Sequence, residues 1–287
     1  MLTDKRWIAE RNELAVLKCL GQFGHLTRND LARAVWPHGD HGGSDKMAKV
    51  TVARLLENGY VMQKKSLQRA RCLILTKAGA NRLAVHGVIA DPGHSIDPFG
   101  AHFMHRALAN RYLIERMVER RNEGTVYSEY DFYRGQAGLS RDWFIKTFGK
   151  IPDGLVMGPG AERSLDPSTV WADWVEVEYA RKEQKELDKI VSLASRSNWL
   201  IEEKSIILDR IVFVYDRELA HEQAIVTALG RYRDTLPAAK QNDEQFWERF
   251  RLIRCTLDDT RKWKGSEEVT GVQLLDVMPL MQAEVNE

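Results

Sequence analysis

Two short runs of the sequence have the composition of neighbouring β-strands, yet they carry acids where a strand is otherwise apolar. The first is Lys150–Met157, which follows Gly149. In the second, Trp174–Tyr179, apolar and acidic residues alternate, so Glu176 and Glu178 point to the same face. Two neighbouring carboxylates repel each other and resist burial. A sheet that contains both runs must therefore neutralise these acids.

A divalent cation is one way to neutralise them. If the two strands lie side by side, Asp153, Glu176 and Glu178 converge as oxygen ligands, and such ligands suit magnesium or manganese. An ion of this kind activates water or a phosphate ester. The alternative is a solvent-facing acidic pair on an edge strand, which needs no ion.

The arrangement resembles the core of PD-(D/E)XK nucleases, in which an Asp on one strand is followed by Glu-x-Lys on the next. Pro152-Asp153 corresponds to the first part, and Glu176-Val177-Glu178 stands in place of Glu-x-Lys, so an acid replaces the lysine. Lys182 or Lys185 on the following helix would have to substitute for it. The resemblance implies metal-dependent DNA cleavage with four catalytic residues, Asp153, Glu176, Glu178 and Lys182.

The composition is that of a globular chain long enough for two domains. The chain has 287 residues, of which 44% are hydrophobic and 29% charged. No apolar run approaches the roughly 20 residues of a membrane span, and the N-terminus lacks the apolar segment of a signal peptide. The three cysteines lie far apart without metal-ligand spacing, so we expect a reducing, cytoplasmic setting.

Charge is unevenly distributed along the chain. Residues 1–90 contain 15 lysines and arginines and 7 acidic residues, a net charge of +8, while residues 91–287 carry −7. A basic N-terminal part joined to an acidic remainder is typical of a nucleic-acid-binding domain attached to another domain.

The N-terminal part has the pattern of three helices. Apolar periodicity predicts a helix over residues 7–20, and Thr27 begins a capping pattern before a second, short helix. Ser44 is expected to cap a third helix over residues 45–57. Its apolar residues are expected to be buried: Met47, Val50, Val52 or Ala53, Leu55 and Leu56.

A basic β-hairpin is predicted next, with strands at residues 60–62 and 72–75. A closing helix follows to about Val85. Three helices and a basic hairpin predict a winged helix-turn-helix, whose third helix fits the major groove of DNA. The alternative is a winged helix used for dimerisation or protein contacts. We expect the DNA-contacting residues to be Lys46, Lys49, Thr51, Arg54, Lys64, Lys65, Arg69 and Arg71.

The breaks in residues 91–101 predict a linker between residues 1–90 and a second domain, residues 102–287. The predicted order in this domain is helix, three strands, helix, strand, helix, strand, which gives an α/β layer with a mixed sheet. The PD-(D/E)XK core has the same order. The expected segments are helix 102–121, strands 126–132, 150–157 and 174–179, helix 181–197, strand 206–215, helix 218–234 and strand 250–257, with a polar loop over 133–149.

With a winged helix before this core, the chain resembles the replication-relaxation family of plasmid and mobile-element proteins, which includes MobC-type relaxases. The similar stretches are Leu73–Gly79, His105–Asn110, Pro152-Asp153-Gly154 and Glu176-Val177-Glu178, within about residues 10–215. The resemblance implies recognition of an origin of transfer or replication, strand-specific nicking with Mg²⁺ or Mn²⁺, and other mobilisation or replication proteins as partners.

Two hypotheses of different class follow. In the first, the protein is a metal-dependent DNA-nicking relaxase of plasmid mobilisation. In the second, it is a sequence-specific DNA-binding regulator or accessory protein with a catalytically inactive nuclease-like domain. Both require double-stranded DNA as partner, and either is compatible with a homodimer.

Overall fold

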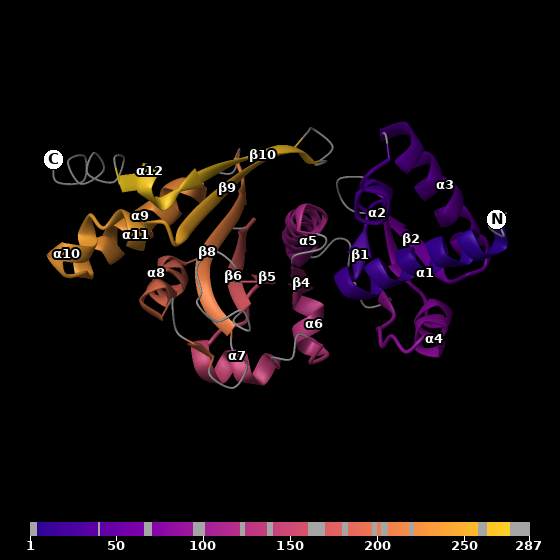
Figure 1. Ribbon diagram of the computed structural model, residues 1–287, viewed down its shortest axis with the longest axis horizontal. Helices are drawn as coiled ribbons and strands as arrows, with labels where there is room; N and C mark the ends of the chain where they lie inside the picture. The colour runs from indigo at the N-terminus through magenta and orange to yellow at the C-terminus, as the bar shows by residue number, and fades with distance from the viewer. Residues whose placement is uncertain are drawn as a thin grey trace. The chain divides into compact units, whose positions relative to one another are not determined.

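The computed structural model shows a mixed α+β protein, as the sequence predicts. It forms two compact units (Figure 1): unit 1 comprises residues 1–121 and 127–141, and unit 2 comprises residues 122–126 and 142–287. The structure describes residues 5–39, 41–65, 71–93, 101–120, 124–136, 140–159, 170–179, 183–196, 200–201, 206–217, 221–257 and 263–275.

Unit 1 begins with helices and a small sheet, in the order α1, β1, α2, α3, β2, β3, α4, and continues with α5 and α6. The three strands form an antiparallel sheet in the order β1-β3-β2, with Val61 opposite Leu75 and Lys65 opposite Arg71. The predicted hairpin is therefore present. The element bounds are α1 Lys5–Phe23, β1 His25–Leu26, α2 Arg28–Val35, α3 His41–Glu57, β2 Val61–Lys65, β3 Arg71–Leu75, α4 Lys77–Val85, α5 Ala101–Glu119 and α6 Glu129–Tyr133.

Local sequence signals account for several helix ends. Thr27 forms the predicted capping box with Asp30: its side chain accepts the N–H of Asp30, and Asp30 Oδ2 accepts the N–H of Thr27 at 2.9 Å. Gly24 follows α1 with φ 74° and Gly59 follows α3 with φ 68°, conformations that glycine adopts without steric cost. These signals lie within a few residues of the helix end that they define.

Helix α5 packs within unit 1, on α2 and β1, whereas the predicted boundary assigned residues 102–287 to the second domain. Asn110 is buried on α5, and its Nδ2 atom donates to the carbonyl oxygens of Phe23 and His25 at 2.9 and 3.0 Å. Phe23 is the last residue of α1 and His25 is the first residue of β1, so the Asn110 side chain joins both elements to α5. The first division between the compact units falls after residue 121, and the sequence does not show that the long helix belongs with the N-terminal elements.

The strand predicted over residues 126–132 is shorter than expected. Strand β4 covers Thr125–Ser128, and α6 begins at Glu129. Ser128 and Asp131 form a capping box, in which the N–H of Ser128 donates to Asp131 Oδ2 at 2.8 Å. This pairing starts a helix and stops the strand.

Unit 2 contains a mixed sheet with the strand order β10-β9-β8-β6-β5-β4. A seventh strand, β7, also pairs with β8 but does not belong to this order. Strands β6, β8 and β9 are parallel neighbours, and β5 and β10 pair antiparallel with β6 and β9. The remaining bounds are α7 Arg141–Phe148, β5 Gly154–Pro159, β6 Val170–Glu178, α8 Gln184–Ser192, a 3₁₀ turn Leu193–Arg196, β7 Leu200–Ile201, β8 Ile206–Asp216, α9 His221–Thr235, α10 Ala238–Gln241, α11 Glu244–Trp247, β9 Phe250–Leu257, β10 Trp263–Thr270 and α12 Gly271–Leu275.

Apolar residues of the central strands and flanking helices form the core of unit 2. Helix α7 lies where a polar loop over residues 133–149 was predicted, and it covers part of β6. Phe144 and Phe148 contact the ring of Trp174 edge-on, with centroids 5.8 and 5.2 Å apart. Helices α8 and α9 pack on each other (Figure 1). Within the described residues, no helix has both the length and the apolar character needed to cross a membrane.

Candidate functional site

Helix α3 has a buried side and an exposed side, but they differ from those predicted. The buried residues are Ser44, Ala48, Thr51, Val52 and Leu55. Met47, Val50 and Leu56, which the sequence places inside, are 38%, 48% and 38% exposed. The observed buried face is therefore rotated around the helix axis relative to the predicted one. Apolar residues occur on both sides of α3, so their periodicity alone could not select the side that is buried.

Ser44 is not the predicted N-cap of this helix. The helix begins at His41, three residues earlier, and Ser44 lies inside it. Its Oγ atom donates to the carbonyl oxygen of Trp36 at 2.7 Å, which ties α3 to the end of α2. Arg28 at the start of α2 also pairs with Asp45 at 3.0 Å. Side chains on both helices thus set the α2–α3 turn.

The predicted DNA-contacting residues of α3 divide into two groups. Lys46 and Lys49 are exposed, as predicted. Thr51 is 1% exposed and faces the interior, so its side chain cannot reach a base. Arg54 is bound to Glu13 of α1, with Nε 3.2 Å from Oε1, and Glu13 also pairs with Arg82 of α4 at 3.0 Å. Thr51 is therefore corrected to a core residue. Arg54, whose side chain is 38% exposed, forms an ion pair inside unit 1, and its contact with DNA stays a prediction.

The hairpin contributes further cations. Lys65 and Arg71 are exposed and lie directly opposite each other at the end of the described strands. Two like charges in this position repel, and a bound anion would relieve the repulsion. Lys64 is half-buried opposite Cys72. Arg69 lies outside the described residues.

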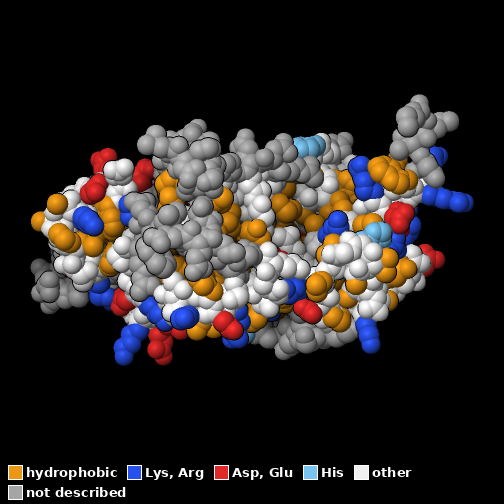
Figure 2. Space-filling view, turned by 60° about the horizontal axis from the view of Figure 1, so that its bottom comes forward, with side chains coloured by type: hydrophobic (Ala, Val, Ile, Leu, Met, Phe, Trp, Pro, Cys, Tyr) orange, Lys and Arg blue, Asp and Glu red, His pale blue; other side chains and the backbone are white. Residues whose placement is uncertain are grey.

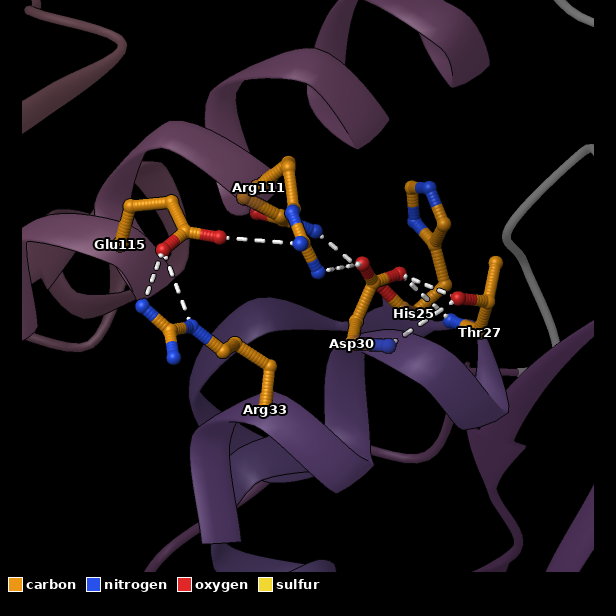
Figure 3. A network of polar contacts seen from close by, with 7 residues as sticks. His25, Thr27, Asp30, Arg33, Arg111 and Glu115 are labelled. Carbon is orange, nitrogen blue, oxygen red and sulfur yellow. Dashed lines mark hydrogen bonds and ion pairs between the residues drawn. The ribbon is translucent and has the colours of Figure 1, made fainter. Parts of the chain in front are cut away.

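A polar network attaches α2 to α5 (Figure 3). Arg111 Nη1 lies 3.2 Å from Asp30 Oδ1, and Arg111 Nη2 lies 2.9 Å from Glu115 Oε1. Glu115 Oε2 also accepts from Arg33 at 2.8 Å. Because Asp30 belongs to the capping box with Thr27, one side chain fixes both the start of α2 and its position on α5.

His25 lies next to this network and is 2% exposed. Its ring stacks on Phe103 of α5, with centroids 4.2 Å apart. Burial, together with the charge of Arg106, lowers the pKa of His25 to about 4. His25 is thus neutral at neutral pH and serves as a packing residue between β1 and α5.

The acidic strand of unit 2 is central and buried. Strand β6 lies between β5 and β8, and Glu176 and Glu178 are 0% and 2% exposed. The alternative of a solvent-facing acidic pair on an edge strand is therefore wrong. The register places Leu155 opposite Trp174, so Asp153, immediately before β5, lies on the same face as Glu176.

Asp153 and Glu176 have protein partners in this arrangement. Asp153 Oδ2 accepts the N–H of Val177 at 2.7 Å. Glu176 Oε1 accepts from the indole Nε1 of Trp174 at 2.6 Å, and Glu176 Oε2 lies 2.6 Å from Lys150 Nζ. A lysine thus neutralises the buried carboxylate, which is the role that the sequence assigned to a metal ion.

Lys150 is the residue of this site that the sequence analysis did not identify. It precedes β5 in the chain, whereas the sequence predicts the lysine on the helix after β6. Of the two candidates there, Lys182 lies outside the described residues and Lys185 is exposed on α8. Only the pairing of β5 with β6 brings Lys150 to Glu176, and no motif in the sequence signals this contact.

The fit of a metal ion to these acids is poor in the described structure. Both oxygens of Glu176 and one oxygen of Asp153 already bind protein groups. No group of three or more His, Cys, Asp or Glu side chains among the described residues is placed to hold an ion. The proposed Mg²⁺ or Mn²⁺ site at Asp153, Glu176 and Glu178 therefore stays a prediction from the sequence.

A second polar cluster anchors α9 to the sheet. Glu222 accepts from Tyr215 at 2.6 Å and from Arg254 Nε at 2.8 Å. The hydrogen bond from Arg254 is the main cause that lowers the pKa of Glu222. Burial, followed by the hydrogen bond to Glu222, raises the pKa of Tyr215. These mutual bonds stabilise the junction of β8, α9 and β9.

The face drawn in Figure 2 mixes side chains of several types. On the face in Figure 2, Lys and Arg side chains project beside hydrophobic and acidic ones.

Comparison of the chain with protein-family models, with curated proteins and with solved structures returned no match.

Proposed function

We propose that this protein binds duplex DNA through helix α3 and the β2–β3 hairpin of unit 1. The observation that carries this proposal is the placement of Lys46 and Lys49 on the exposed side of α3, with Lys65 and Arg71 at the end of the hairpin. The order α1-β1-α2-α3-β2-β3 and the sheet order β1-β3-β2 support a winged helix-turn-helix. In such a domain the third helix enters the major groove and the hairpin contacts the phosphate backbone.

The side-chain contacts that hold α3 on α2 support the same proposal. Ser44 and Asp45 connect α3 to α2, and α2 is bound to α5 by Arg111 and Glu115. A recognition helix that is fixed before binding does not have to be ordered on contact with DNA, and this reduces the cost of association.

The test is the salt dependence of binding by the full chain to a fluorescent duplex of random sequence, measured by anisotropy. Each phosphate contact contributes a slope of about 0.9 in log K against log salt. The Lys46→Ala/Lys49→Ala variant is expected to reduce the slope by up to about two units, and Lys65→Ala/Arg71→Ala by a similar amount. Lys185→Ala, an exposed lysine of unit 2, is the control and should leave the slope unchanged.

Absence of salt-dependent affinity for any duplex would refute the proposal. If the Lys46→Ala/Lys49→Ala variant then changed the oligomeric state in sedimentation, the winged helix would be a dimerisation module. We further propose that the protein acts as a DNA-binding regulator or accessory protein at an origin of transfer or replication. This role is supported by the order of the sequence motifs.

DNA nicking is the second candidate function, and the contact between Lys150 and Glu176 favours it. A lysine, an aspartate and a glutamate on one face of β5 and β6 have the residue types of a nuclease site, with Lys150 in place of the absent motif lysine. The order of strands β4, β5, β6 and β8 supports a PD-(D/E)XK-like core. Complete burial of Glu176 and its bonds to protein groups favour a structural role instead.

Nicking is tested by incubating the protein with supercoiled plasmid that carries a candidate origin, with and without Mg²⁺ or Mn²⁺. Open circles that disappear with both Asp153→Asn and Lys150→Met would support an enzyme. If the protein binds the plasmid but the plasmid stays supercoiled under all conditions, nicking is refuted and the role of a DNA-binding regulator is favoured.

A further inference from the structure

The exposed side of α3 carries apolar side chains as well as lysines. Met47 is 38% exposed and Val50 is 48% exposed, although the same helix buries Ala48, Val52 and Leu55. These two residues are three positions apart and therefore neighbours on the helix surface. Val50 lies well away from the buried residues of α3, and Met47 lies at the edge of the buried side, one helical turn before Thr51.

Both lysines of α3 are exposed as well. Lys46 lies one helical turn before Val50, so these two side chains are neighbours on the helix surface. Lys49 lies about 100° around the helix from Val50, so the exposed part of α3 carries positive charge beside the apolar pair. The nearby hairpin adds Lys65 and Arg71. This mixture differs from a protein-docking face, whose core is depleted of lysine.

Duplex DNA matches this combination of chemistry. Phosphates complement the lysines, and the only apolar group that the bases present in the major groove is the C5-methyl group of thymine. A helix that enters the groove with Met47 and Val50 toward the bases would bury these side chains against such methyl groups. An isolated exposed apolar residue needs no explanation, but two neighbours on the exposed part of a helix that also carries lysines do.

We infer that Met47 and Val50 recognise thymine methyl groups, so that the protein selects duplexes with A·T pairs at the positions that face the middle of α3. This inference rests on the proposed function and specifies its substrate. It assigns specificity to apolar residues, while the lysines supply affinity that is independent of sequence.

The test compares thymine with deoxyuridine, which lacks only the methyl group. Duplexes that the full chain retains from a random-sequence pool are resynthesised with dU at each dT position in turn, and affinities are measured by anisotropy. Loss of one buried methyl group is expected to weaken binding about fourfold. The Met47→Ala/Val50→Ala variant should bind the dT and dU duplexes equally well and keep the salt slope of the unchanged protein, because it loses no cation.

The control is Val85→Ala, since Val85 is an apolar residue of α4 that is 84% exposed. This variant should keep the discrimination between dT and dU. Equal affinity of the unchanged protein for all dT and dU duplexes would overturn the inference and leave DNA binding intact, as would discrimination that persists in Met47→Ala/Val50→Ala. If the protein retains no duplex from the random-sequence pool, the proposed function and this inference are both overturned.

Discussion

Lys150 Nζ lies 2.6 Å from Oε2 of Glu176, a side chain with no exposed surface. Lys150 itself keeps 24% of its side chain exposed, so the ammonium group reaches inward from the edge of the unit. The pair explains how a glutamate can occupy a central strand, next to the aromatic contacts of Trp174 with α7.

Removal of Lys150 should therefore destabilise unit 2. Lys150→Ala removes the cation that pairs with the buried carboxylate of Glu176, and we expect a loss of about 3 kcal/mol in the free energy of unfolding. Urea denaturation followed by circular dichroism measures it. Glu176→Gln in the Lys150→Ala background removes the buried negative charge and should restore part of the stability. Equal stability of Lys150→Ala and the unchanged protein would show that the ion pair is not formed in solution.

Stability should depend on pH through His25. The pKa of His25 is about 4 in the folded chain, against 6.5 for an unperturbed histidine. Between these values the unfolded chain binds a proton that the folded chain does not, so stability falls as pH is lowered from 6.5 to 4, by on the order of 3 kcal/mol.

Denaturation series at several pH values test this dependence. His25→Phe, which can keep the stacking on Phe103, should flatten the pH profile between 6.5 and 4. His38→Asn changes an exposed loop histidine and should leave the profile unchanged. A profile that is identical in all three proteins would contradict the assignment of His25.

The network between α2 and α5 should contribute more to stability than a surface ion pair. Arg111, 18% exposed in its side chain, binds both Asp30 and Glu115, and Arg111→Ala should cost about 2 kcal/mol. Arg28→Ala breaks the pair with Asp45, whose side chains are 47% and 44% exposed, and should cost less than about 1 kcal/mol. Chemical denaturation ranks the two variants, and the reverse order would show that α5 is held to α2 by apolar contacts instead.

Arg54→Ala should affect stability rather than sequence preference. Its guanidinium group pairs with Glu13, which keeps Arg82 as a second partner, so the expected loss is about 1 kcal/mol. In anisotropy measurements the salt slope should change less than in Lys46→Ala/Lys49→Ala. Relaxed sequence preference at unchanged stability would instead assign Arg54 to base contacts.

Elements with signals inside a few residues could be predicted from the sequence. The capping box of Thr27 and Asp30, the hairpin and the strand Phe250–Leu257 are present as predicted. Ser128 and Asp131 carry the same kind of capping signal, which predicts that a helix begins after Ser128 and that the strand before it is short. The acidic and basic residues of the candidate sites could be named from the sequence, because strand alternation and clusters of charge are read directly from it. Their contacts could not be predicted in this way.

The sequence by itself determined where most helices and strands form, since caps, glycines and apolar periodicity act within one or two turns of chain. Only the tertiary structure decided which side of α3 is buried, because Met47 and Val50 are as apolar as the residues that pack inside. It also decided that α5 packs on α2, and that Lys150, 26 residues before Glu176 in the chain, neutralises it. Such contacts depend on which surfaces meet when distant segments pack, and no local pattern encodes that choice.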